Sequence, residues 1–332
     1  MGKTKIDWAT HVWNPTVGCT AVTNGCRYCY ARRLHDQRHK AALEGKRVPA
    51  LYLKPFSEVQ MLQARVDDPL RWRLYPRRRI FVDSMSDLFH QDVSDDFIAR
   101  LWASMRLAPT HSFLILTKRP ERAAEFTNSE EFANKVRDRL ASSDWQWPLP
   151  NVWIGASVSN QADLEKFMPY LRRVRAAGRF LSVEPMLGSM DLTPWLHPDY
   201  EGIQKQAEWT PVDVDDYRYN SIDWVICGGE TGGKYQARPV HQNWVRDLRD
   251  QCVVSGTPFF FKQWGDAIPY DQATEKQRET AKSGFTTIAG NGESGDVGHW
   301  LRLPKSKAGH LLDGVEWRQY PDRLKDGDEI SR

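Results

Sequence analysis

Three cysteines near the N-terminus have the spacing of a metal or cluster site. Six residues separate Cys19 from Cys26, and two separate Cys26 from Cys29, in the segment WNPTVGCTAVTNGCRYCY. Three thiolates on one glycine-containing loop can bind three corners of a cubane 4Fe-4S cluster and leave the fourth iron without a protein ligand. A small molecule with an amine and a carboxylate, such as S-adenosylmethionine, can chelate that open iron. The cysteines therefore indicate redox chemistry at a cluster.

Two other interpretations of these cysteines stay open. A structural zinc site closes with four ligands, so it would have to recruit one more. The candidates for that fourth ligand are His11, His35, Cys227 and Cys252. A thioredoxin-like redox pair would use Cys26 and Cys29 and leave Cys19 without a role. Cys227, in an apolar run, and Cys252, on a helical face, are expected to be buried small apolar residues instead.

Apolar runs alternate with helical patterns along most of the chain, which is the rhythm of βα units around a parallel sheet. Seven strands are predicted, at Thr10 to Thr16, Arg79 to Ser84, Ser112 to Thr117, Asn151 to Ser157, Arg179 to Glu184, Ile222 to Cys227 and Pro258 to Gln263. Helices are predicted at Tyr30 to Glu44, Asp95 to Leu107, Glu130 to Ala141, Asp163 to Ala177 and His241 to Val254. The middle strands are almost continuously apolar, as expected of strands buried on both faces.

This repeated order predicts an α/β fold, a TIM-type parallel barrel that is complete or partial, with about six to seven βα units. The first strand is not followed by the Gly-x-Gly-x-x-Gly of a dinucleotide-binding sheet. The barrel is expected over residues 1–265, with a polar, acidic insertion at about 193–221. Residues 266–332 have little periodicity and are expected to form an irregular extension or lid that packs on the barrel.

In a barrel of this type, side chains just past the C-terminal ends of the strands converge on one face. The candidates after the second, third and fourth strands are Asp83, Ser84 and Ser86, then Lys118 and Arg119, then Ser157, Ser159 and Asn160. Hydroxyl and carboxyl oxygens suit an ammonium group or a ribose, and two cations suit a carboxylate or phosphate. A helix cap, a surface ion pair and a helix start are the respective structural alternatives.

The later strands supply candidates for the reacting groups. Glu184 places a carboxylate at the end of an apolar run, where a charge is costly unless it is paired or used. Gly228, Gly229 and Glu230 form a turn whose backbone could approach a ligand closely. Lys262 could bind an anion, and Trp264 could either stack on a ring or close the barrel. Glu184, Glu230 and Lys262 are the candidate catalytic residues.

The ending Cys26-Arg27-Tyr28-Cys29, after a first barrel strand, resembles the signature of the radical S-adenosylmethionine superfamily. The chain more closely resembles an uncharacterised, phage- and prophage-associated branch of it, on the segments WNPTVGCT, SVEPMLG, ICGGETGG and KAGHLLDGVEW. Most members separate the first two cysteines by fewer residues. Their Gly-Gly-Glu follows the second strand, whereas Gly228-Gly229-Glu230 follows the sixth, so its usual role is not carried over.

The resemblance implies an enzyme that cleaves S-adenosylmethionine reductively to a 5'-deoxyadenosyl radical, which abstracts hydrogen from a substrate. Cys19, Cys26 and Cys29 would bind the cluster, and Tyr28 would contact the cofactor. A reductase or a flavodoxin- or ferredoxin-type protein would donate the electron. The rival classes are a non-catalytic zinc- or cluster-stabilised nucleic-acid-binding protein, and an enzyme without a cluster that uses Glu184 and Glu230 as an acid/base pair.

Composition sets broad limits on the partners. The chain has 40% hydrophobic and 27% charged residues, and no long apolar run, so a soluble, cytoplasmic protein without a membrane partner is expected. A net charge of +3 does not by itself indicate nucleic acid, but cations gather in one stretch and there are 14 tryptophans. The stretch holds Arg71, Arg73, Arg77, Arg78 and Arg79. Together with Lys118 and Arg119, these features are compatible with a nucleotide or a nucleic-acid base as substrate.

Overall fold

All seven predicted strands are present and pair in the order in which they occur along the chain. The computed structural model describes residues 2–72, 76–140, 146–196, 221–232, 236–281, 285–289 and 297–325. The large sheet has the order β1-β2-β5-β6-β7-β8-β9-β10, and all its ladders except β1·β2 are parallel. Its strands are β1 (Gly2–Lys3), β2 (His11–Trp13), β5 (Arg79–Val82), β6 (Ser112–Thr117), β7 (Val152–Val158), β8 (Gly178–Val183), β9 (Trp224–Gly228) and β10 (Phe259–Gln263).

The sheet is strongly curved, and Trp8 shows this directly. Its ring centroid lies 4.6 Å from that of Phe81 on β5 and 6.4 Å from that of Trp224 on β9. In a flat sheet, strands four positions apart would be separated by about 19 Å. One indole can contact both only because the sheet curls around it. Alternate strand residues, including Leu114, Trp153 and Phe180, line this concave interior.

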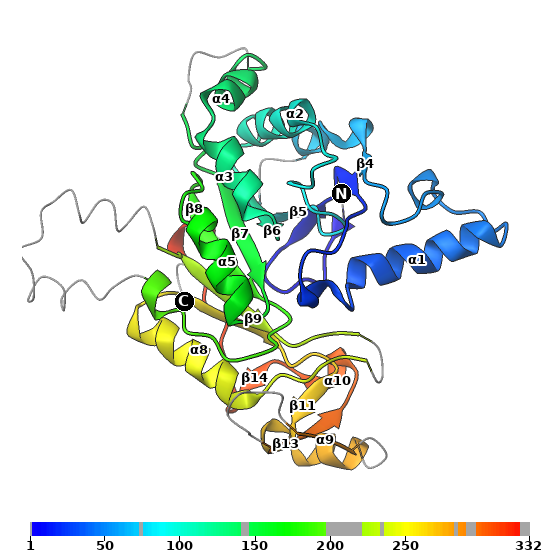
Figure 1. The fold of residues 1–332 in the computed structure, drawn as a ribbon, viewed down its shortest axis with the longest axis vertical. Helices are drawn as coiled ribbons and strands as arrows, with labels where there is room; N and C mark the ends of the chain where they lie inside the picture. The colour runs from blue at the N-terminus through cyan, green and yellow to red at the C-terminus, as the bar shows by residue number, and fades with distance from the viewer. Residues whose placement is uncertain are drawn as a thin grey trace, which may run out of the picture.

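The helices lie on the outer side of the curved sheet. Figure 1 shows α2 (Asp95–Arg106), α3 (Pro120–Asn128), α5 (Gln161–Leu171) and α8 (Gln242–Val254) along one side of the strands, with α4 (Glu130–Arg137) beyond them. On the opposite side α1 (Tyr30–Leu43) extends away from the sheet. The predicted apolar face of the fourth helix is buried in the core, with Leu164, Phe167, Met168, Leu171 and Val174.

The C-terminal segment lies along the open edge of the sheet. Within the described residues, the strand order ends at β1 on one side and β10 on the other, with no ladder between them. The Trp317 carbonyl accepts from the backbone N–H of Phe261 at 2.8 Å, and the Tyr320 hydroxyl donates to the carbonyl of Asp7 at 3.1 Å. Residues 317–320 therefore connect β10 to the N-terminal segment, and the fold contains a curved parallel sheet of the TIM type.

Several predicted bounds need correction. The first strand divides into β2 and β3 (Thr16–Val17), and β3 pairs with β4 (Gln60–Met61) instead of continuing the large sheet. Helix α3, which starts at Pro120, was not predicted. The helix predicted at 130–141 ends at Arg137, and the one predicted at 163–177 is α5, which begins and ends earlier. Asn160 sets the start of α5, because its side chain accepts from the backbone N–H of Asp163 at 2.9 Å.

The C-terminal extension is more regular than expected. It contains β11 (Ala267–Pro269), β12 (Phe285–Ala289) and β13 (Val297–Arg302), which form an antiparallel sheet in the order β11-β13-β12. The other elements are α9 (Glu275–Thr280), α10 (Lys305–Ala308), β14 (Leu311–Leu312) and β15 (Val315–Glu316). Of the proposed insertion at 193–221, residues 197–220 lie outside the described residues, as do Arg73 and Gly233.

None of the helices in the described parts of the chain has both the length and the apolar character needed to cross a lipid bilayer.

Candidate active site

The cysteine loop is fixed at both of its ends. It leaves β3 through Gly18, whose φ is +101° and where a Cβ would lie 2.7 Å from the Glu58 carbonyl oxygen. The backbone N–H of Cys19 donates to the Phe56 carbonyl at 2.8 Å. At the other end Cys29 is the residue that precedes α1, and its carbonyl accepts from the backbone N–H of Arg33 at 3.1 Å. The loop conformation is therefore set by the protein backbone.

The same loop lies across the C-terminal ends of the strands. Gly25 packs so closely on Ser159, just past β7, that a Cβ there would lie 2.2 Å from the Ser159 Oγ. Arg119, just past β6, donates to the Thr20 carbonyl at 3.2 Å and to the Cys19 Sγ at 3.7 Å. All three cysteines of the loop are free and half-buried. Arg119 thus contacts Cys19, and Ser159 contacts the loop at Gly25, both at the C-terminal ends of the strands.

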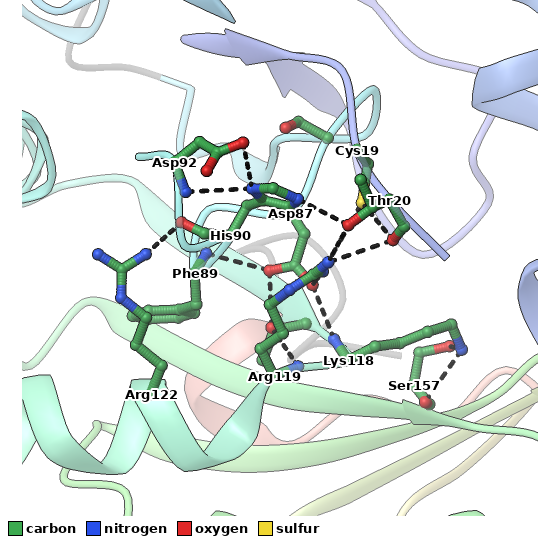
Figure 2. Close-up of polar contacts among 12 residues, drawn as sticks. Cys19, Thr20, Asp87, Phe89, His90, Asp92, Lys118, Arg119, Arg122 and Ser157 are labelled. Carbon is green, nitrogen blue, oxygen red and sulfur yellow. Dashed lines mark hydrogen bonds and ion pairs between the residues drawn. The ribbon is translucent and has the colours of Figure 1, made fainter. Parts of the chain in front are cut away.

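Asp87 organises the cations beside the loop, as Figure 2 shows. Its buried carboxylate accepts from the Thr117 hydroxyl at 2.7 Å and from the backbone N–H groups of Phe89 and Lys118 at 3.0 Å. The guanidinium of Arg119 donates to it at 2.9 Å. Four donors satisfy the carboxylate, and through the charge-assisted contact Asp87 aims Arg119 at the loop.

Lys118 is the second cation beside the thiols. Its ammonium donates to the Ser157 hydroxyl at 2.8 Å and to the Ser157 carbonyl at 3.1 Å. Burial lowers the pKa of Lys118, and the negative charge of a Cys26 thiolate opposes this shift. Burial likewise raises the pKa of the Cys19 thiol to about 11, and the charge of Asp87 adds to this effect. A bound metal would reverse that balance, because it stabilises the thiolate.

A second ion pair stands at the ends of β8 and β10. The Lys262 ammonium donates to both carboxylate oxygens of Glu184 at 2.8 Å, and the Gln263 amide donates to one of them at 3.2 Å. The Glu184 carbonyl accepts from the Ser157 hydroxyl at 3.3 Å. Ser157 thereby connects the Lys118 side of the site to the Glu184 side.

A third ion pair clamps the cysteine loop from the β9 side. Arg238 donates to the buried Glu230 carboxylate through its backbone N–H at 2.8 Å and its Nε at 2.9 Å, and it also pairs with it through Nη2. The same guanidinium donates to the Asn24 side chain at 3.0 Å and lies 5.4 Å from the ring centroid of Tyr28. Glu230 therefore acts on the cysteine loop through Arg238.

The loop has several features of a cluster site. Two buried hydroxyls next to Gly25, those of Thr23 and Ser159, have no hydrogen-bond partner among the described residues. A group bound at the loop would supply one. No three His, Cys, Asp or Glu side chains in the described ranges are already gathered into a metal-binding arrangement. The donor set fits a 4Fe-4S cluster, and ligation by Cys19, Cys26 and Cys29 stays a prediction.

The fourth ligands that a zinc site would recruit are engaged elsewhere. His35 is buried in ring contacts with Tyr52 and Phe56 and lies 3.3 Å from the Leu51 carbonyl. His11 contacts Thr10 at the start of the sheet. As predicted, Cys227 and Cys252 are fully buried in the core. A closed four-ligand zinc site would need a ligand other than these.

Comparison with known proteins places the chain in a family. A family model described as "Protein of unknown function (DUF5131)" matches residues 3–321. The chain belongs to the DUF5131 family. No curated protein matches this DUF5131 chain.

Solved structures of spore photoproduct lyase are similar to this DUF5131 protein. A cysteine-to-serine variant has a TM-score of 0.37 at 11% identity, with 92% of this chain and 72% of that chain covered. The complex with dinucleoside spore photoproduct has a TM-score of 0.34 at 10% identity, over the same shares of the two chains. A double variant with bound AdoMet and the dinucleoside has a TM-score of 0.36 at 10% identity, over 91% and 70%. Similarities this weak carry no argument about the chemistry of this chain.

Some predicted site residues of the DUF5131 chain have structural partners instead. The Asp83 carboxylate is buried and accepts from the backbone N–H of Thr16 at 2.9 Å. Ser84 donates to the Asn14 side chain at 3.0 Å, and Ser86 to the Gly18 carbonyl at 2.6 Å. These residues hold the segment before Cys19 in place. Asn160 is the N-cap of α5, so it has the helix-start role that the sequence predicts as the alternative to ligand binding.

The glycine turn after β9 packs closely against Trp264. A Cβ on Gly229 would lie 2.0 Å from the Trp264 carbonyl oxygen, and one on Gly228 would lie 3.2 Å from Glu184 Oε1. Trp264 is buried and donates to the Leu311 carbonyl at 2.9 Å. One side of the Gly229 backbone therefore packs on Trp264, and ligand binding by this turn stays a prediction. Trp264 itself is a buried core residue.

The arginine stretch lies at the opposite end of the sheet from the cysteines. Arg77 donates to the Ser112 hydroxyl at 2.9 Å, and Arg79 donates to the Leu324 carbonyl at 3.0 Å. The guanidinium of Arg79 stacks on Tyr320, at 4.3 Å from the ring centroid. At least Arg77 and Arg79 thus fasten the C-terminal segment to the starts of the strands, and they do not support nucleic-acid contact at the site.

Sequence reasoning missed Asp87, Arg238 and Asn24. Asp87 lies in the turn after β5, and Lys118 and Arg119 directly follow β6, the neighbouring strand, so a search for an acid near that cation pair could have found it. Arg238 and Asn24 are 214 residues apart, and no local pattern connects them. Their contact follows from the fold alone.

Proposed function

We propose that this chain is a radical S-adenosylmethionine enzyme with a 4Fe-4S cluster on Cys19, Cys26 and Cys29. One observation carries the proposal. The three half-buried, free cysteines sit on a loop that the fold holds across the C-terminal ends of the strands, with Arg119 3.7 Å from the Cys19 Sγ. The segments quoted above also support membership in the phage- and prophage-associated branch of that superfamily.

When bound, the cluster would supply an electron to S-adenosylmethionine and so generate a 5'-deoxyadenosyl radical. The residues of the chain bind and orient. Lys118 and Arg119 bring positive charge next to the thiolates, which offsets part of the negative charge that three thiolates bring into a half-buried site. Arg238 holds Asn24 and Tyr28 in place between the cysteines.

The Glu184–Lys262 pair is the second half of the proposed site. Both side chains are mostly buried, with exposures of 21% and 12%. A ligand with an ammonium and a carboxylate can exchange partners with such a pair. Glu184 therefore is proposed to bind a cation of the cofactor or substrate, and Lys262 an anion. Ser157 and Ser159 add hydroxyls on the β7 side, where a ribose could be bound.

An acid/base enzyme without a cluster is disfavoured by the same contacts. Glu184 is paired with Lys262, and Glu230 with Arg238. A general base needs an accessible carboxylate oxygen within reach of the proton that it removes. Each of these two carboxylates is instead bound by a cation, which disfavours that role.

A nucleotide or a nucleic-acid base remains the predicted substrate class. The arginine stretch no longer supports it, since Arg77 and Arg79 contact the C-terminal segment. A flavodoxin- or ferredoxin-type protein or a reductase remains the predicted electron donor, since the electron has to come from outside the chain.

The test is anaerobic reconstitution with iron and sulfide, followed by electron paramagnetic resonance of the dithionite-reduced protein. We expect a cluster signal that changes when S-adenosylmethionine is added and is lost in Cys26→Ala. Cys252→Ala is the matched control, because Cys252 is a free thiol buried in the core. Stoichiometric zinc with no cluster signal would overturn the proposal and favour a zinc-stabilised binding protein.

A further inference from the structure

One segment projects from the molecule and has a larger net positive charge than the whole chain. We call residues 27–58 the basic arm. It consists of α1 and the chain that returns along it through the turn at Ala50–Tyr52, and Figure 1 shows α1 extending away from the sheet. Only Ala31 and His35 of α1 are buried. Most of the helix surface is therefore available to a partner.

The charge of the basic arm differs in sign from that of the rest of the chain. The arm has eight Lys and Arg residues and three Asp and Glu residues, a net charge of +5, whereas the whole chain has +3. The remaining residues therefore sum to a net charge of −2. Concentration of positive charge on one projecting element is the electrostatic pattern of a polyanion-binding surface.

Three exposed cations of the arm have no partner within the part of the chain that the structure describes. Arg33, Lys40 and Arg47 make no side-chain hydrogen bond or ion pair with any described residue. Other cations of the arm are used internally. Arg38 binds the Tyr52 hydroxyl, Arg32 lies 5.8 Å from the Phe56 ring centroid, and Lys46 and Lys54 pair with Glu44 and Glu58. The arm thus keeps its shape with one set of cations and presents another to solvent.

The free cations lie on the outward face of the arm. Arg33 and Lys40 are seven residues apart on α1, which is two helical turns or about 10 Å, on the side opposite Ala31 and His35. Arg47 is exposed on the segment that follows the end of the helix. Cations spaced along an extended element match the repeated phosphates of a nucleic acid strand better than a compact acidic patch.

The arm begins at the candidate active site. Helix α1 starts at Tyr30, directly after Cys29, and the backbone N–H of Arg33 donates to the Cys29 carbonyl. Tyr30 is 40% exposed, and its hydroxyl donates to the Ser84 carbonyl at 2.6 Å at the strand ends. A polymer bound along the arm would therefore continue to the face of the barrel that carries the cysteines.

We propose that the basic arm binds the phosphodiester backbone of a nucleic acid. This inference rests on the proposed function in one respect, because it makes the substrate of that function a base within a polymer instead of a free nucleotide. Backbone contacts of this kind position the polymer without reading its sequence. Binding should accordingly depend on salt and vary little with base sequence.

The test is fluorescence anisotropy of a labelled DNA duplex and of its single strand, titrated with the full-length protein at several salt concentrations. We expect the triple variant Arg33→Ala/Lys40→Ala/Arg47→Ala to lose affinity for every sequence tried. The slope of log K against log salt should fall in magnitude by about two to three, because each phosphate that the variant no longer neutralises reduces the slope by about one.

The control removes the same charge from other elements. Arg137, Lys166 and Lys307 are exposed and lie on α4, α5 and α10. Their triple alanine variant should bind as the wild type does. Equal losses in both variants, or an unchanged salt slope in the arm variant, would overturn the proposal. The arm variant could instead bind nucleic acid normally but no longer be reduced by an acidic flavodoxin-type protein. That result would overturn the proposal and show that the arm binds the electron donor.

The binding assay also separates this inference from the proposed function. Cys26→Ala, which cannot form the cluster, should bind the duplex as the wild type does, because the arm supplies the contacts. A reconstituted wild type that binds the duplex but shows no cluster signal would then reject the radical chemistry and leave the arm in place. Loss of binding in the arm variant alone, with the cluster signal intact, supports the arm as the nucleic-acid surface.

Discussion

The Arg119 guanidinium donates to the Cys19 Sγ at 3.7 Å while the Asp87 carboxylate holds it at 2.9 Å. The residues come from three separate segments, the cysteine loop, the turn after β5 and the end of β6. Partners that orient a metal ligand and donate to its sulfur affect both metal affinity and reduction potential. Arg119 is therefore a positioning residue of the proposed cluster site.

Replacing Arg119 should weaken the cluster site specifically. We expect Arg119→Met to retain iron about tenfold less well after reconstitution. Loss of the cation should also shift the midpoint potential of the remaining cluster to more negative values. Arg119→Lys should recover part of the shift, because lysine keeps the positive charge. It lacks the planar guanidinium that donates to both Asp87 and Cys19. Iron analysis measures the first effect and a redox titration the second, with Arg139→Met as the surface control. An unchanged midpoint potential in Arg119→Met would show that Arg119 does not act on the cluster.

The Glu230–Arg238 pair should stabilise both the fold and the cysteine loop. Glu230 is 4% exposed at its side chain and Arg238 25%, so Arg238→Met leaves a buried carboxylate unpaired. We expect a loss of about 2 to 3 kcal/mol in the free energy of unfolding, less than for a fully buried pair because Arg238 is partly solvated. Glu230→Gln/Arg238→Met should recover part of this loss.

Two measurements check the role of Arg238. Urea denaturation gives the stability change, and limited trypsin digestion at Arg27 reports whether the loop has become accessible. Faster cleavage is expected in Arg238→Met, since this variant cannot donate to Asn24. The same cleavage rate as in Arg137→Met, a control at an exposed position on α4, would show that Arg238 does not fasten the loop.

Trp8 should be a main determinant of the curved sheet. Trp8→Ala removes ring contacts to Phe81, Phe180 and Trp224 from the concave interior of the sheet. We expect a loss of about 3 to 5 kcal/mol in the free energy of unfolding. Trp195→Ala, at a half-exposed position, should cost about 1 kcal/mol or less. Similar losses at both positions in urea denaturation would contradict the role assigned to Trp8.

Asp83 should make stability depend on pH. Burial raises its pKa from 3.8 to about 8, so the folded state binds a proton that the unfolded state releases between these values. Its contribution to stability is therefore fully present below about pH 4 and is lost as the pH rises towards 8, at up to about 1.4 kcal/mol per pH unit. Asp83→Asn should remove this dependence, because Asn tolerates the φ of +60° and is never charged.

The check is the free energy of unfolding of both proteins from about pH 5 to about pH 8, which lies between the two pKa values. The wild type should lose stability relative to Asp83→Asn as the pH rises, and contributions from other groups cancel in the difference. A constant difference across this range would mean that Asp83 is already ionised in the folded protein at the acidic end.

The middle strands were predictable because each is a short, nearly continuous apolar run, which reflects burial on both faces. Helix α3 was missed because it starts at Pro120 directly after Arg119, so the segment read as the loop that carries the cation pair. The sheet in the C-terminal extension was missed because its strands have no clear alternation. Their pairing, as in Thr286 with Trp300, depends on contacts between segments.

The site was predictable in its location but only in part in its contacts. Residues next to strand ends, such as Arg119 and Glu184, could be nominated because parallel strands end on one face. Their partners could not be assigned in the same way. The contact between Glu184 and Lys262 spans 78 residues of sequence, and that between Arg238 and Asn24 spans 214, so both depend on how the sheet curls.

The most direct test of the proposed activity is to detect the products of S-adenosylmethionine cleavage. The reconstituted, dithionite-reduced protein should form 5'-deoxyadenosine and methionine in equal amounts, even without its substrate, and Cys26→Ala should form neither. Cys252→Ala should behave as the wild type does. A protein that holds a full cluster and binds S-adenosylmethionine but releases no 5'-deoxyadenosine would contradict the radical mechanism.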